Sequence, residues 1–146
     1  MSTVLVGYDG HERSDRALDH AIDAARDRQA KLVVLAVLEL PFNPEGPQNF
    51  GSIEPNEVDF IPLEESPPEL EPVFARARAR VEAAGAAAEY EWAAGNPADS
   101  IVGTARDRHA SLVVLGAHEH SWLGRLVGSD VAAEVRGRVD GEVEAV

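Results

Sequence analysis

The chain contains no cysteine, and this absence excludes several kinds of chemistry at once. Without thiols there is no disulfide bond, no thiolate nucleophile and no cysteine-ligated zinc site. Aromatic residues are also scarce, at 5% of the chain. Stability must come from aliphatic packing instead, and 146 residues of which 45% are hydrophobic suffice for one domain with a real core. We therefore expect a single domain over residues 1–146.

Positive charge is in short supply. Thirteen Lys and Arg residues stand against 26 Asp and Glu residues, which leaves a formal net charge of −13. This charge repels nucleic acids and anionic membranes, so neither is an expected partner. Lys31 is the only lysine, a composition that resembles proteins of salt-loving organisms, where a Debye length of about 3 Å at 1 M salt screens dense carboxylates. An acidic protein from a GC-rich genome is the alternative.

Long hydrophobic runs are absent as well. No apolar run approaches the roughly 18 residues that a membrane span needs, and no basic and apolar leader pattern opens the sequence. The run KLVVLAVL at residues 31–38 has the length of a strand buried on both faces. We therefore expect a cytoplasmic protein.

What the sequence does contain is an alternation of strand and helix patterns. Short apolar runs predict strands, and apolar residues at helical spacing predict helices. Strands are expected at residues 3–8, 31–38, 87–94, 112–115 and 141–146, and helices at residues 14–25, 70–85, 96–105 and 131–135. Residues 39–68, rich in Pro, Gly, Asn and Glu, form an expected long loop that is either functional or mobile. This order predicts an α/β domain with a doubly wound parallel sheet, which binds ligands beyond the carboxyl ends of its strands.

Two helix starts carry recognisable capping residues. Asn96 can cap the third helix, Pro97 fits its first position, and Asp99 suits its positive end. Ser14 is expected to cap the first helix rather than to act as a nucleophile, because no base is placed beside it.

The segment VVLGAHEHSWLGRLVGSDVAAEV, residues 113–135, begins like a phosphate-binding loop. An apolar run meets Gly116, and further glycines precede a helical pattern, the arrangement in which bare amides and a helix start face an anion. Asp9 and Gly116 each follow an expected strand, so both should lie at the ligand-binding edge of the sheet. Within the segment, His118-Glu119-His120 is too sparse a pattern to predict a metal site.

Three parts of the sequence carry a resemblance to a known family. VLVGYDGHERSDRAL, GNPADSIVGTARDRHASLVVLGAH and the later Gly128-Ser129 resemble the universal stress protein family, over most of the chain outside the long loop. The resemblance implies a five-stranded parallel sheet of order 3-2-1-4-5, similar to adenine nucleotide alpha hydrolases, and a homodimer formed through the last strand, here residues 141–146. One branch of the family binds ATP through a Gly-x2-Gly-x9-Gly-Ser/Thr motif. Another branch lacks that motif and is not known for nucleotide binding.

The motif is only partly kept in this sequence. Gly116 matches its first glycine and Asp9 matches the acidic residue at the nucleoside end, whereas Glu119 stands where the second glycine admits phosphate. Gly128-Ser129 arrives one residue early. The resemblance makes the following residues the candidate nucleotide site: Asp9, Gly116, His118, Glu119, Gly128 and Ser129.

The defects favour a degenerate site. A carboxylate about 4 Å from a phosphate oxygen costs on the order of 4 kcal/mol at an effective dielectric of 20, which is near three decades of affinity. We therefore expect a stress-response binding or regulatory module with no cofactor and no metal, rather than an enzyme with an assigned turnover. The alternative is an ATP-binding member with slow hydrolysis that holds ATP and magnesium through Asp9, Gly116, Gly128 and Ser129. A phosphate-accepting receiver domain, with Asp9 as acceptor, is disfavoured because it needs a lysine late in the chain.

Overall fold

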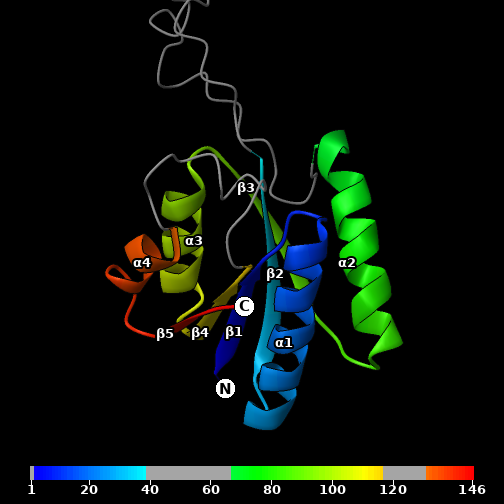
Figure 1. The fold of residues 1–146 in the computed structure, drawn as a ribbon, viewed down its shortest axis with the longest axis horizontal. Coiled ribbons are helices and arrows are strands. Elements are labelled where there is room, and N and C mark those ends of the chain that lie inside the picture. Colours follow the sequence, from blue (N-terminus) through cyan, green and yellow to red (C-terminus); the bar gives the residue numbers. More distant parts are fainter. Residues whose placement is uncertain (1, 39–66, 117–130) are drawn as a thin grey trace, which may run out of the picture.

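The computed structural model describes residues 2–38, 67–116 and 131–146 (Figure 1). The strands are β1 (Thr3–Gly7), β2 (Lys31–Leu38), β3 (Glu89–Ala94), β4 (Ala110–Leu115) and β5 (Glu142–Ala145). The helices are α1 (Glu12–Arg28), the 3-10 helix η2 (Pro68–Leu70), α2 (Glu71–Ala83), α3 (Pro97–Asp107) and α4 (Val131–Arg136). Strand and helix alternate as the apolar patterns predict.

The five strands form one parallel sheet of order β3-β2-β1-β4-β5. β1 lies at its centre, with Val4 opposite Leu32 of β2 on one side and opposite Leu112 of β4 on the other. The predicted order 3-2-1-4-5 is confirmed. The strand order reverses direction at β1, so the crevice for a ligand in such a fold lies at the carboxyl ends of β1 and β4.

Helices cover both faces of the sheet, α1 and α2 on one side and α3 and α4 on the other (Figure 1). Successive residues of β1 therefore enter different cores: Val4 packs in the cluster that contains Leu18 of α1, and Leu5 packs in the cluster that contains Ile101 of α3. This double coverage explains why β1, β2 and β4, apart from a polar residue near the start of each, are continuously apolar instead of alternating.

The predicted N-terminal caps of two helices can be compared with the structure. At α3 the prediction is confirmed, since Oδ1 of Asn96 accepts a hydrogen bond of 3.1 Å from the backbone N–H of Asp99. At α1 it is wrong: the N-cap is His11, and Ser14 lies inside the first turn, where its hydroxyl group bonds to Asp9 instead.

Several element boundaries differ from the sequence prediction by one to three residues. The expected loop ends earlier than residue 68, because Pro68 begins η2, whereas residues 39–66 lie outside the described part of the chain. The second helix is expected to extend to residue 85, but α2 ends at Ala83, and Ala84, which follows it, is exposed.

Candidate functional site

The turn between β1 and α1 places Asp9 at the carboxyl end of the central strand. The backbone N–H of Tyr8 still donates to the carbonyl oxygen of Leu35, at 2.9 Å, so pairing with β2 continues one residue past β1. Gly10 then adopts φ +84°, a left-handed conformation that side-chain-bearing residues rarely adopt. The chain can therefore turn sharply into α1 while Asp9 stays at the carboxyl end of β1.

The carboxylate of Asp9 is held by its own turn. Its Oδ1 atom accepts hydrogen bonds from Ser14 Oγ at 2.6 Å and from the backbone N–H of His11 at 3.0 Å, and His11 Nδ1 lies 3.3 Å away. The backbone N–H of Asp9 in turn donates to Ser14 Oγ, at 3.2 Å. With its side chain only 4% exposed, Asp9 is a fixed acceptor rather than a mobile surface charge.

Gly116 meets the same turn from β4. A Cβ atom at this position would lie 3.3 Å from the backbone carbon and oxygen of Arg13 and 3.5 Å from the backbone nitrogen of Ser14. The end of β4 therefore packs directly against the first turn of α1, and this close approach by itself favours glycine. We call Asp9, Ser14 and Gly116 the β1/β4 site.

Of the candidate residues, the structure thus brings Asp9 and Gly116 together, through Ser14. His118, Glu119, Gly128 and Ser129 lie outside the described residues, so their part in the site stays a prediction. Ser14 is a site residue that was not predicted from the sequence. The available signal was its position five residues after Asp9, in the first turn of the helix that follows the central strand.

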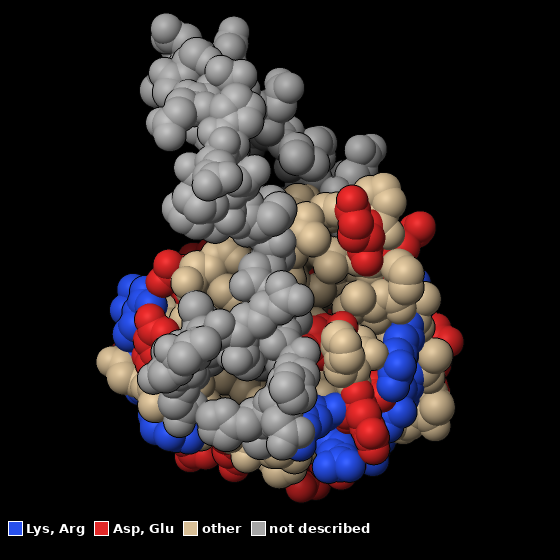
Figure 2. Space-filling view, turned by 45° about the horizontal axis from the view of Figure 1, so that its top comes forward, with Lys and Arg blue, Asp and Glu red and all other residues tan. Residues whose placement is uncertain are grey.

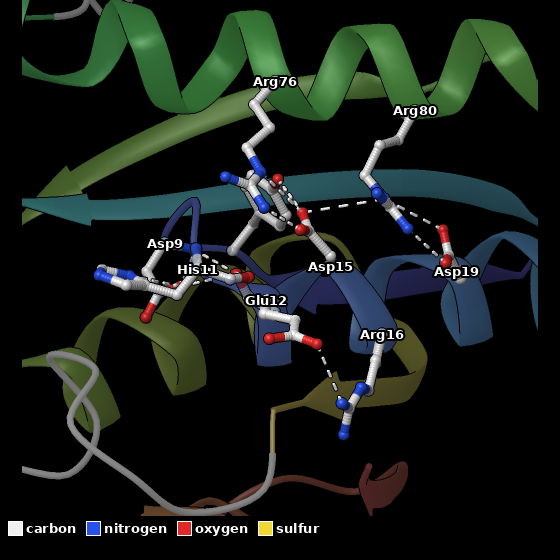
Figure 3. Close-up of polar contacts among 10 residues, drawn as sticks. Asp9, His11, Glu12, Asp15, Arg16, Asp19, Arg76 and Arg80 are labelled. Atoms are coloured by element: carbon white, nitrogen blue, oxygen red, sulfur yellow. Dashed lines mark hydrogen bonds and ion pairs between the residues drawn. The ribbon is translucent and has the colours of Figure 1, made fainter.

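A second polar cluster lies next to this site and was not predicted. We call Tyr8, Asp15, Asp19, Arg76 and Arg80 the Asp15 cluster. Arg76 and Arg80 reach from α2 toward α1, where Asp15 and Asp19 face them (Figure 3). The Arg80 Nη2 atom lies 2.7 Å from Asp19 Oδ2, and the Arg76 guanidinium and the Tyr8 hydroxyl both donate to the Asp15 carboxylate.

The sequence did contain a signal for this cluster. Asp15 and Asp19 are four residues apart on one helix, and Arg76 and Arg80 are four residues apart on the next, so each pair shares one helix face. Only the packing of α2 against α1 shows that the two faces meet.

The surroundings shift the ionisation of both buried members of the cluster. Burial and the adjacent Asp15 carboxylate raise the pKa of Tyr8 well above its ordinary value, so its hydroxyl stays a donor. Burial alone would raise the pKa of Asp15, but hydrogen bonds from Arg76 and Tyr8 and the nearby Arg80 charge outweigh it and lower that pKa. Asp15 is therefore a buried, charged and fully engaged carboxylate.

Comparison with known proteins decides the family. The model of the universal stress protein family matches residues 1–143. The chain belongs to this family. Among curated proteins, it is 29% identical over 136 residues to the universal stress protein YxiE of Bacillus subtilis, covering 92% of this chain and 91% of that protein.

Solved universal stress proteins share the fold. One, described as a universal stress protein in complex with cAMP, is 30% identical with a TM-score of 0.66, over 99% of this chain and 96% of that chain. Another, the universal stress protein from Archaeoglobus fulgidus in complex with dAMP, is 21% identical with a TM-score of 0.64, over 99% of this chain and 97% of that chain, and supports the fold alone.

The described surface of this universal stress protein carries charges of both signs. Acidic and basic side chains lie interspersed on the face shown in Figure 2. Within residues 2–38, 67–116 and 131–146, no helix is both long enough and apolar enough to cross a membrane, and no three His, Asp or Glu side chains gather as a metal site would require.

Proposed function

We propose that this universal stress protein is a cytoplasmic regulatory module that binds an adenine mononucleotide at the β1/β4 site, and that it binds ATP more weakly. The observation that carries the proposal is the junction of Asp9 and Gly116 through Ser14, at the carboxyl ends of β1 and β4, where the strand order reverses. The solved relative described with cAMP, at 30% identity, supports an adenine nucleotide as the ligand class.

The chemistry of the site suits the nucleoside end of such a ligand. A carboxylate that is fixed and accepts hydrogen bonds, as Asp9 does, would bind a hydroxyl or amino group rather than a phosphate. The phosphate would face the loop that follows Gly116, where Glu119 replaces a motif glycine. Because cAMP brings one phosphate charge and ATP brings several, repulsion by Glu119 and by the net charge of −13 penalises ATP more.

The proposed order of affinities, with cAMP or AMP above ATP, can be tested by isothermal titration. The ligands are cAMP, AMP and ATP with magnesium, each at dilute and molar potassium chloride. We expect cAMP or AMP to bind at least about tenfold more tightly than ATP, which corresponds to about 1.4 kcal/mol. Asp9→Ala is the control that should weaken all three. Micromolar or tighter ATP binding would favour the alternative, an ATP-binding member with slow hydrolysis, and no binding of any of the three would refute a nucleotide site.

Replacing Glu119 tests why ATP is disfavoured. Glu119→Gly should raise ATP affinity, by up to about three decades if the full repulsion of roughly 4 kcal/mol is removed. Glu119→Gln, which removes the charge without opening space, separates repulsion from crowding. A double variant that combines Glu119→Gly with the insertion of one residue before Gly128 should bind ATP better than Glu119→Gly alone, because it also restores the motif spacing. Unchanged ATP titrations for all three variants would contradict the degenerate-motif explanation.

A further inference from the structure

Ser14 is the residue that joins the two halves of the β1/β4 site. It is 4% exposed, its backbone nitrogen lies against Gly116, and its hydroxyl contacts Asp9 twice. The hydroxyl accepts from the backbone N–H of Asp9 and donates toward the Asp9 carboxylate. A single side chain on α1 thus sets where both the backbone and the carboxylate of Asp9 lie.

The hydroxyl has only one proton to donate. Two acceptors lie within reach, Asp9 Oδ1 at 2.6 Å and the carbonyl oxygen of His11 at 2.9 Å. The carboxylate is both closer and charged, and charge-assisted hydrogen bonds are the stronger kind, so we assign the proton to Asp9 Oδ1.

The carboxylate of Asp9 is used unevenly. Ser14 and both His11 contacts all fall on Oδ1. Engaging one oxygen in this way fixes the rotation of the carboxylate, so that the direction of Oδ2 is set before any ligand arrives. Preorganisation of this kind strengthens binding because the ligand does not have to order the acceptor.

We propose that Ser14 is a positioning residue for nucleotide recognition: it holds Oδ1 of Asp9 so that Oδ2 accepts a hydrogen bond from the nucleoside end of the ligand. This inference rests on the proposed function and adds a residue that acts on the nucleotide only through Asp9. If Ser14 merely stabilised the start of α1, its replacement would affect folding, and any effect on nucleotide affinity would be the same with and without the Asp9 carboxylate.

A double-mutant cycle separates these two roles. The variants Ser14→Ala, Asp9→Ala and the double variant are titrated with cAMP and with AMP, alongside the unmodified chain. We expect Ser14→Ala to weaken binding about tenfold, and to change it by less than about twofold when Asp9 is already alanine. Ser14→Thr, whose hydroxyl can make the same contacts, should restore most of the affinity.

Ser111→Ala is the matched control. It also removes one serine hydroxyl, that of the half-buried Ser111, which bonds to the carbonyl oxygen of Thr3 at 3.2 Å at the opposite end of β4. Its nucleotide affinity should stay within about twofold of the unmodified chain. Thermal melting followed by circular dichroism checks the fold of each variant, and Ser14→Cys, with a weakly donating thiol of similar size, replaces Ser14→Ala if the latter does not fold.

Each possible result supports or overturns the positioning role of Ser14. Unchanged affinity in Ser14→Ala, or an equal loss with and without the Asp9 carboxylate, overturns the positioning role while the proposed function stands. An equal loss in Ser111→Ala also overturns it, because the effect would then be general. If the unmodified chain binds neither cAMP nor AMP, the proposed function fails and takes this inference with it.

Discussion

Asp15 is a buried carboxylate that accepts a hydrogen bond from Tyr8 and forms ion pairs with Arg76 and Arg80. Asp15→Asn should lower the free energy of unfolding by about 2 kcal/mol at neutral pH, because it removes a charged partner from buried hydrogen bonds. The pKa of Asp15 is lower in the folded protein than its ordinary value of 3.8. Its contribution is therefore fully present above that value and is lost as the pH falls through the folded-state pKa.

Urea denaturation at pH 7 and at decreasing pH below 4 measures this effect, with the difference between Asp15→Asn and the unmodified chain expected to shrink in acid. Asp19→Asn is the control on the same helix. Its side chain is 54% exposed, and its pairing with Arg80 should contribute no more than about 1 kcal/mol. Equal losses for Asp15→Asn and Asp19→Asn would mean that burial of the Asp15 cluster contributes nothing to stability.

Among the secondary-structure elements, β5 depends on one close backbone approach. A Cβ atom at Gly141 would lie 2.6 Å from the carbonyl oxygen of Ala110 and 2.8 Å from that of Ser111, both in β4. Gly141→Ala must therefore push the start of β5 away from β4, at a cost of about 1–3 kcal/mol. Urea denaturation measures the loss, and amide hydrogen exchange should show faster exchange in β5.

Gly137 provides the matched control for this prediction. A Cβ atom there would lie 3.7 Å from the carbonyl oxygen of Ala133, an ordinary contact distance. Gly137→Ala should leave the free energy of unfolding within about 0.5 kcal/mol. If Gly141→Ala and Gly137→Ala change the free energy of unfolding equally, the close approach of β5 to β4 does not explain the glycine at position 141.

For the molecule as a whole, the net charge of −13 dominates the response to salt. Mutual repulsion of carboxylates opposes the compact state, and salt screens it. The melting temperature should rise as potassium chloride increases from dilute to molar concentration. A flat or falling series of melting temperatures, recorded by circular dichroism, would remove the salt-adapted interpretation of the composition.

We also propose that two copies pair through β5, the edge strand next to β4. Val143 of β5 is buried in the core of its own chain. Glu142 pairs with Arg28 of α1, and Glu144 contacts His20 of α1. Light scattering at tens of micromolar protein should show a dimer that tightens with salt, because two acidic chains repel less when screened. A monomer at both dilute and molar salt would contradict this assembly.

The sequence by itself determined the class of fold and the order of its elements. Period and composition sufficed, because strands buried on both faces must be apolar along their buried length, as residues 32–38 are, and amphipathic helices must repeat near 3.6 residues. The Asn96 cap followed from a local pattern for the same reason, since its hydrogen bond spans only three residues. The strand order came from the family resemblance and not from periodicity.

Only the tertiary structure decided which side chains meet. Ser14 was expected to cap α1, but the turn at Gly10 brings Asp9 back to its hydroxyl group, a contact that depends on the path of the backbone. Gly116 was assigned to phosphate approach, yet the close packing of β4 on α1 by itself favours glycine there. Asp15 and Arg76 are 61 residues apart, and they pair because α1 and α2 lie on the same face of the sheet. Local patterns specify elements, whereas contacts between elements depend on how the whole sheet and its helices pack.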